Sequence, residues 1–92
     1  MKTVLMISHD VKDYSEWKKE FDAGETMRND AGVKVIGVFK DENNANNVTV
    51  ITEVPSAEAA KGLLTNAELK ATMEKAGVIS EPVFKILNNV NN

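Results

Sequence analysis

Four short segments of this chain carry large aliphatic or aromatic side chains on both of their alternating faces. They are residues 4–9, 33–40, 48–54 and 83–87. In the first segment, for example, Leu5 and Ile7 lie on one face while Val4 and Met6 lie on the other. A strand with one face in water alternates apolar and polar residues instead. Both faces of the predicted sheet therefore need to be covered.

Two helical regions separate these strands. The first is predicted over residues 14–31, and the second comprises residues 57–64 and 67–76. The side chains that suit helix starts are Asp13 with Glu16 three residues later, Ser56 and Asn66, and the glycines that suit helix ends are Gly32 and Gly77. Between the second and third strands, residues 41–47 are predicted to form a polar loop.

The resulting order is strand, helix, strand, strand, helix, strand. With right-handed crossovers and a central hairpin, this order predicts a ferredoxin-like βαββαβ fold of the α+β class. Its four-stranded antiparallel sheet has the spatial order fourth, first, third, second, with both helical regions on one face. We expect a single domain over residues 1–92, because domains of this size have one core.

The second face of the sheet is predicted to be covered by another copy of the chain. Leaving about four aliphatic side chains in water forfeits on the order of 6–12 kcal/mol of burial. That is comparable with the whole stability of a domain. The chain has no cysteine, so disulfides cannot reinforce a small core. We therefore expect a homodimer; the alternative is that the extra apolar residues belong to edge strands.

Composition argues against several classes of partner and cofactor. The net charge is −3 and the lysines do not cluster, so nucleic acid is not expected. The apolar run at residues 4–7 is too short for a membrane span or a secretion signal, so we expect no membrane partner and a cytoplasmic protein. One histidine without cysteine does not make a metal site of ordinary ligand number, and no glycine-rich phosphate loop follows a strand. No metal or cofactor is expected.

Two stretches of the sequence resemble a known family. They are His9–Lys18 followed by Phe21 and Asp22, and residues 67–70 followed by Met73 and residues 75–78. Both are similar to segments of small dimeric α+β-barrel proteins of the antibiotic-biosynthesis monooxygenase type. The resemblance implies a ferredoxin-like subunit, sheets packed face to face in a dimer, and a ligand cavity between sheet and helices.

The same family includes cofactor-independent oxygenases that form quinones, enzymes that degrade haem, and members without known activity. The haem-degrading branch relies on an asparagine, a tryptophan and a histidine in set places. Here the first strand has no asparagine and the second helical region has no histidine. The resemblance therefore implies small-molecule binding and does not extend to haem degradation.

The candidate catalytic residue is His9, the only histidine of the chain. It lies at the end of the first strand, and its near-neutral pKa suits proton transfer. The topology predicts Tyr14, Trp17, Phe39 and Met73 near the same end of the sheet, as the ligand-binding walls of a pocket. The alternatives are a half-exposed histidine at a strand end and aromatic residues that only fill the core.

Two other charged residues are candidates for a site role. Glu53 is predicted about 15 Å or more from His9, at roughly 3.3 Å per residue along antiparallel strands, so the two cannot form a dyad. It is expected to face solvent or to pair with a lysine. Arg28 lies near the helical face of the aromatic residues, where its guanidinium could hold a carboxylate ligand or form an ion pair.

Two functions are compatible with this pattern. The first is a cofactor-independent oxygenase or isomerase of a small aromatic or polyketide-like molecule, in which His9 takes a proton. The second is a non-catalytic binding or sensing module that uses the same cavity. They are distinguished by whether a second polar group reaches His9 within a closed cavity. A His9 that faced bulk water would argue against the oxygenase.

Overall fold

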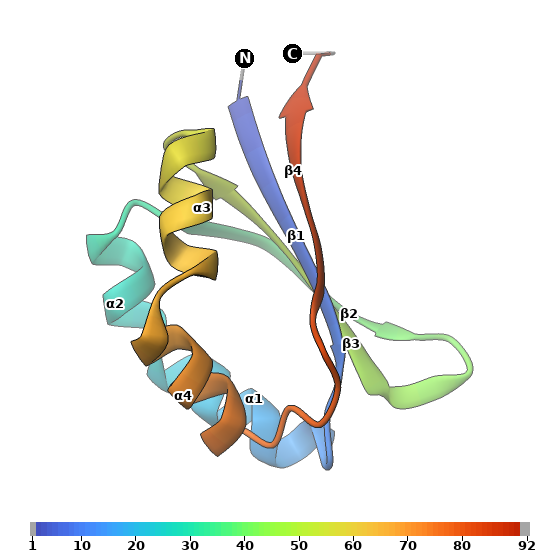
Figure 1. Cartoon of the computed structure of the whole chain (residues 1–92). Helices are drawn as coiled ribbons and strands as arrows, with labels where there is room; N and C mark the ends of the chain where they lie inside the picture. Colours follow the sequence, from blue (N-terminus) through green and yellow to red (C-terminus); the bar gives the residue numbers. More distant parts are fainter. Residues whose placement is uncertain (1, 91–92) are drawn as a thin grey trace.

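A computed structural model describes residues 2–90, which form a four-stranded sheet with its helices on one face (Figure 1). In chain order the elements are β1 (Lys2–Asp10), α1 (Tyr14–Ala23), α2 (Glu25–Asp30), β2 (Lys34–Asp41), β3 (Asn44–Val54), α3 (Ala57–Leu64), α4 (Ala67–Lys75) and β4 (Val83–Asn89). The strand order is β2-β3-β1-β4, and every neighbouring pair is antiparallel. The predicted ferredoxin-like α+β topology is confirmed.

The helix boundaries follow from local side-chain chemistry. Asp13, Ser56 and Asn66 each accept a hydrogen bond from a backbone N–H in the first turn of the helix that follows, at 3.1, 3.0 and 2.7 Å. Gly32 and Gly77 have φ of 76° and 87°, the left-handed conformation that ends a helix at little cost in glycine. These predicted starts and ends are confirmed.

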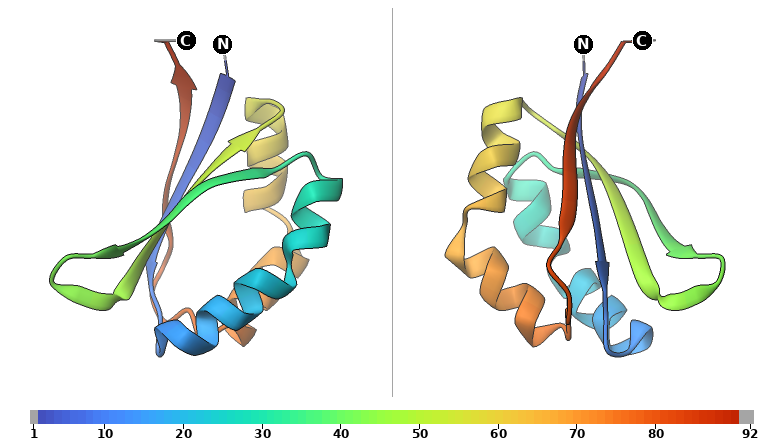
Figure 2. Two further views of the ribbon diagram at one scale, coloured as in Figure 1. Left: turned by 180° about the vertical axis from the view of Figure 1, so that it is seen from behind. Right: turned by 45° about the vertical axis from the view of Figure 1, so that its right-hand side comes forward.

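The first helical region is not the single helix predicted over residues 14–31. α1 ends at Ala23 and α2 begins at Glu25, with Gly24 between them. Glycine is a poor helix former, so the interruption costs least at this position. Because the chain changes direction here, the two helices follow an arc along the sheet (Figure 2).

The β2–β3 connection is shorter than the loop predicted over residues 41–47. Both strands continue to Asp41 and Asn44, which pair with each other and leave a turn of Glu42 and Asn43. The Asp41 carboxylate accepts a hydrogen bond from the Asn43 N–H at 2.9 Å, which closes the turn. The polar residues of this segment are thus part of a hairpin that projects beyond the rest of the sheet (Figure 1).

β2 contains a β-bulge at Ile36. Val35 and Gly37 pair with the consecutive β3 residues Thr52 and Ile51, so Ile36 is an extra residue on one strand. An extra residue reverses the alternation of side chains for the rest of the strand. A glycine inside a strand often accompanies such a bulge.

The bulge overturns the prediction that Phe39 is one of the walls of the pocket beside His9. After the bulge, Val38 pairs with the buried Val50 and packs against the core, and Phe39 lies on the opposite face of the sheet. There its ring covers Gly37 so closely that a Cβ on that residue would lie 2.6 Å from the Phe39 Cζ. Phe39 is therefore excluded from the helix side of the sheet.

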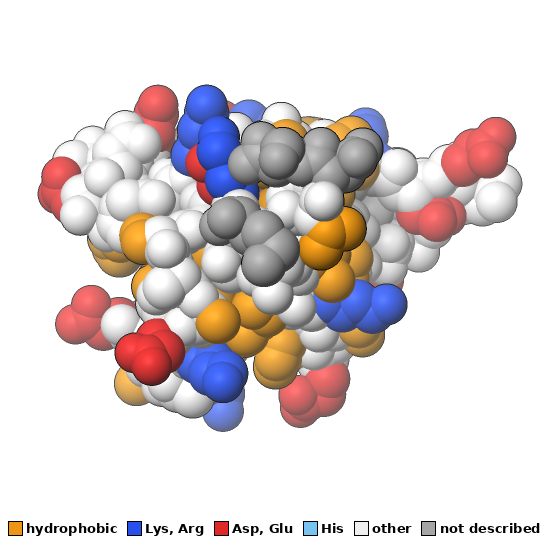
Figure 3. Space-filling view, turned by 90° about the horizontal axis from the view of Figure 1, so that it is seen from above, with side chains coloured by type: hydrophobic (Ala, Val, Ile, Leu, Met, Phe, Trp, Pro, Cys, Tyr) orange, Lys and Arg blue, Asp and Glu red, His pale blue; other side chains and the backbone are white. Residues whose placement is uncertain are grey.

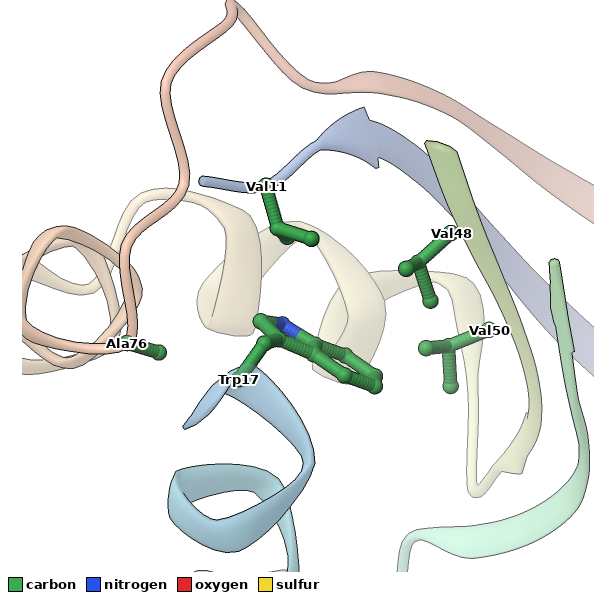
Figure 4. Close-up of a cluster of buried hydrophobic side chains, with 5 residues drawn as sticks. All are labelled: Val11, Trp17, Val48, Val50 and Ala76. Carbon is green, nitrogen blue, oxygen red and sulfur yellow. The ribbon is translucent and has the colours of Figure 1, made fainter. Parts of the chain in front are cut away.

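The core lies between the sheet and the helices in two clusters. One consists of Val11, Trp17, Val48, Val50 and Ala76, and the other of Leu5, Val33, Val54 and Ala60. In the first cluster the Trp17 indole extends from α1 towards Val48 and Val50 of β3 (Figure 4). The helices thus cover one face of the sheet with a large aromatic side chain at one end.

The face of the sheet away from the helices is uncovered in the single chain. Phe39, Val83 and Leu87 lie on it and are 51%, 61% and 44% exposed. Seen from the end where both termini lie, hydrophobic side chains reach the surface between the helices and the strands, with charged side chains around them (Figure 3). Apolar residues on both faces are confirmed, and the second copy that would cover them stays a prediction.

Candidate functional site

A cavity of about 190 Å³ lies between the helices and the sheet. Its lining is largely apolar and comes from β1, β3 and all the helices described above; it includes Leu5, Ile7, His9, Trp17, Phe21, Met27, Arg28, Val50, Thr52, Leu63, Leu69 and Met73. An apolar protein cavity of roughly 150 Å³ is known to hold benzene. The size and lining thus suit a molecule of one or two rings.

His9 lies on the wall of this cavity and is 5% exposed, so the alternative of a half-exposed histidine is wrong. Its Nδ1 is buried and has no hydrogen-bond partner. Burial lowers the pKa of His9, and a backbone hydrogen bond at His9 and the charge of Asp10 oppose that change without reversing it. The imidazole is therefore neutral at neutral pH and has one nitrogen that can accept a proton.

Three aromatic side chains of α1 form a row beside His9. Tyr14, Trp17 and Phe21 share one face of the helix because of their three- and four-residue spacing. The Trp17 ring stacks on Phe21 at 4.9 Å between centroids and lies 5.9 Å from Tyr14. The His9 ring meets Trp17 at 5.8 Å with an interplanar angle of 68°. Trp17 thus connects the histidine to the aromatic wall.

The structure brings together only part of the predicted site. His9, Trp17 and Met73 line the cavity. Tyr14 contacts Trp17 and lies under the Lys40 ammonium group, 4.5 Å from its ring centroid, but does not line the cavity. Phe39 lies on the other face of the sheet, because the bulge at Ile36 reverses the alternation of side chains in the rest of β2.

Glu53 lies far from His9 along the sheet, as predicted. In the register of β1 and β3 it pairs with Val4, whereas His9 pairs with Val48. Its carboxylate lies 3.7 Å from the Lys2 Nζ, the lysine pair expected from the sequence. A His9–Glu53 dyad is excluded within one subunit.

The sequence prediction missed other residues of the cavity wall. Leu63 of α3 and Leu69 of α4 lie opposite the sheet, and Met27 of α2 lines the cavity although it is 63% exposed. Met27 therefore lies where the cavity opens to solvent. The signal for Leu63 and Leu69 was the apolar face of each short helix, which looks the same for a packed core and for a cavity wall.

Neither a cluster of metal-ligating side chains nor a membrane-spanning helix occurs in the part of the chain that the structure describes. Within residues 2–90, no three His, Cys, Asp or Glu side chains are grouped to hold a metal ion. No helix in the same range is long and apolar enough to cross a membrane.

Comparison with known proteins gives matches in structure only. No family sequence model and no curated protein matches the chain. A Caulobacter crescentus protein, provisionally named an antibiotic biosynthesis monooxygenase, has a TM-score of 0.71 and 19% identity over 98% of this chain and 91% of that one. A point mutant of SnoaB, a cofactor-independent oxygenase from Streptomyces nogalater, has a TM-score of 0.72 and 8% identity, covering 99% and 95%.

A third match, Rv0793 from Mycobacterium tuberculosis, has a TM-score of 0.70 and 7% identity, covering 100% of this chain and 98% of the other. At such identities the likeness shows a common fold and no more. The resemblance seen in the sequence is confirmed at that level: the chain has the fold of the antibiotic-biosynthesis monooxygenases.

Proposed function

We propose that this protein is a cofactor-independent oxygenase acting on an aromatic molecule of one or two rings bound in the cavity. The observation that carries the proposal is the buried His9 on the cavity wall, whose Nδ1 has no partner. Burying an unpartnered polar atom costs about 1–3 kcal/mol, and such groups gather at functional sites. The oxygenase activity of SnoaB supports this chemistry by analogy of fold.

A phenol illustrates the reaction. Neutral His9 accepts the phenolic proton, and the electron-rich phenolate that results reduces molecular oxygen and forms a carbon–oxygen bond. Loss of the ring proton at that carbon and cleavage of the oxygen–oxygen bond then give a quinone and water. One oxygen atom enters the product, and the other leaves with two hydrogens of the substrate. The apolar walls keep bulk water from the reactive intermediate.

The test is oxygen uptake and quinone absorbance with a panel of phenols and naphthols. His9→Gln is expected to lower kcat about 10²- to 10⁴-fold, the usual contribution of a general base. Glu53→Gln is the control, because Glu53 lies on the other face of the sheet and pairs with Lys2. Turnover by His9→Gln at the wild-type rate would exclude His9 as the base.

A non-catalytic binding module is the second candidate, and one observation favours it. The His9 Nδ1 has no hydrogen-bond partner among residues 2–90, and the buried Thr52 hydroxyl already donates to the Leu5 carbonyl at 3.2 Å. Trp17, the only tryptophan, lines the cavity, so its fluorescence reports occupancy. Saturable changes in fluorescence without oxygen uptake, for every phenol that binds, would assign the protein to this class.

The proposed assembly is a homodimer in which the two sheets pack face to face. The exposed Phe39, Val83 and Leu87 on the uncovered face support it, because packing them against a second copy would remove apolar surface from water. The cavity lies on the helix side, so a dimer of this kind leaves its lining within one subunit.

A further inference from the structure

The side chain of Arg28, the only arginine of the chain, is held in a fixed position beside the cavity. Its side chain folds back from α2, so that the guanidinium carbon lies 3.9 Å from the centroid of the Phe21 ring. Its Nη1 donates a hydrogen bond to the Phe21 carbonyl at 2.7 Å. A Cβ on Gly24 would come within 3.1 Å of that nitrogen, so the glycine between α1 and α2 leaves room for the guanidinium.

The guanidinium is incompletely satisfied by the protein. Arg28 has five N–H donors, and the bond to Phe21 uses one of them. Its Nε is buried and has no partner, and no carboxylate of residues 2–90 lies within ion-pair distance of it. Burial lowers the pKa of Arg28, while Glu25 and Asp22 act in the opposite direction from a greater distance. Of the two roles that the sequence suggested for Arg28, the ion pair is thus not formed within the subunit.

Arg28 borders two spaces of different character. One is the apolar cavity; the other is an open groove along β2 whose lining includes Asp22 and Glu25. Lys18 and Lys34 also line the groove, and Lys18 pairs with Asp22 at 2.6 Å, so the cations offset the carboxylates there. An ion pair in an open groove is nevertheless weak because water screens it. The cavity is apolar, so a charge-assisted hydrogen bond to Arg28 is stronger there. Of its two carboxylates, Glu20 lies 3.8 Å from the Lys75 ammonium and Glu68 is exposed in the first turn of α4.

We propose that Arg28 binds the anionic group of the cavity ligand, and that this ligand is a small aromatic carboxylate. The carboxylate accepts hydrogen bonds from the free guanidinium donors, and the ring lies against Trp17 and Phe21 towards His9. A fixed guanidinium suits a planar carboxylate because its N–H groups can bind both oxygens at once. This inference rests on the proposed function only in using the same cavity, and it requires no turnover.

The experiment compares phenylpropanoate with its neutral analogue phenylpropanamide, with binding followed by the fluorescence of Trp17. Both probes have the same ring and similar size, so their difference isolates the charge. The wild type is expected to bind the carboxylate about 10- to 100-fold more tightly, the range for a hydrogen bond to a charged group. In Arg28→Gln this preference should disappear while the affinity for the amide is unchanged.

Two variants separate ligand binding from structure. Arg28→Lys keeps a cation that can cap the Phe21 carbonyl, and it should retain a reduced preference for the carboxylate even if Arg28→Gln does not fold. Lys19→Gln makes the same charge change at an exposed position of α1 and should leave the preference intact. Equal affinity of the wild type for both probes, no binding of either, or equal loss of both in Arg28→Gln would each overturn the proposal. Oxygen uptake plays no part in these outcomes, so the oxygenase can fail independently.

Discussion

Replacing His9 by leucine is expected to stabilise the fold while removing the proposed base. The substitution eliminates a buried Nδ1 that has no hydrogen-bond partner, and this raises the free energy of unfolding by about 1–3 kcal/mol. The edge contact of the imidazole with Trp17 is lost, at a cost of about 0.5–1.5 kcal/mol. The net effect is a gain of about 1 kcal/mol at neutral pH, which raises Tm by about 4–8 °C in a domain of this length.

The advantage of the leucine variant should grow as the pH falls. The pKa of His9 is lowered in the folded state from its ordinary value of 6.5, which applies to the unfolded chain. Between these two values the unfolded chain binds more protons, so acid favours unfolding of the wild type. Its stability therefore declines as the pH falls below 6.5, with a slope of at most about 1.4 kcal/mol per pH unit. Above pH 6.5 the imidazole is neutral in both the folded and the unfolded state, so its titration no longer lowers the stability of the wild type.

The assay is urea unfolding followed by circular dichroism between pH 7.5 and pH 5.5, at one fixed chain concentration. Because His9 is the only histidine, no other side chain with an ordinary pKa near 6.5 changes charge in this window. His9→Gln is the matched control: it keeps a buried polar group but does not titrate, so it should lose the pH slope without gaining stability. The reasoning is refuted if His9→Leu is less stable than the wild type at neutral pH and has the same pH slope.

Two further predictions concern the uncovered face and the glycines. Leu87→Glu should convert a dimer to monomers in sedimentation at micromolar concentration, whereas Ile79→Glu, exposed outside the strands, should not; a monomeric wild type would end the dimer proposal. Gly62→Ala in α3, where an added Cβ meets no atom within 4 Å, should raise the free energy of unfolding by about 0.5–1 kcal/mol. Gly32→Ala, at φ 76° with Pro55 3.0 Å from the added Cβ, should lower it by about 1–2 kcal/mol, and similar urea midpoints for both would contradict this account.

The features that the sequence determined by itself are those that depend on neighbouring residues. Asp13, Ser56 and Asn66 start helices because their side-chain oxygens reach N–H groups only two or three residues away. Gly32 and Gly77 end helices because the left-handed conformation is a property of a single residue. With the order of elements set in this way and right-handed crossovers, the sheet order followed, and with it the position of His9 at one end.

The tertiary structure alone decided which side chains face the cavity and how well each is satisfied. The bulge at Ile36 depends on the register between β2 and β3, and it moved Phe39 to the uncovered face although the residue pattern placed it in the site. The burial of His9 and the lack of an ion pair for Arg28 depend on elements that meet only when the chain folds. A sequence pattern predicts faces of single elements, but solvation and hydrogen bonding are set by what lies opposite each face. Here the opposite side leaves the His9 Nδ1 and the Arg28 Nε without hydrogen-bond partners.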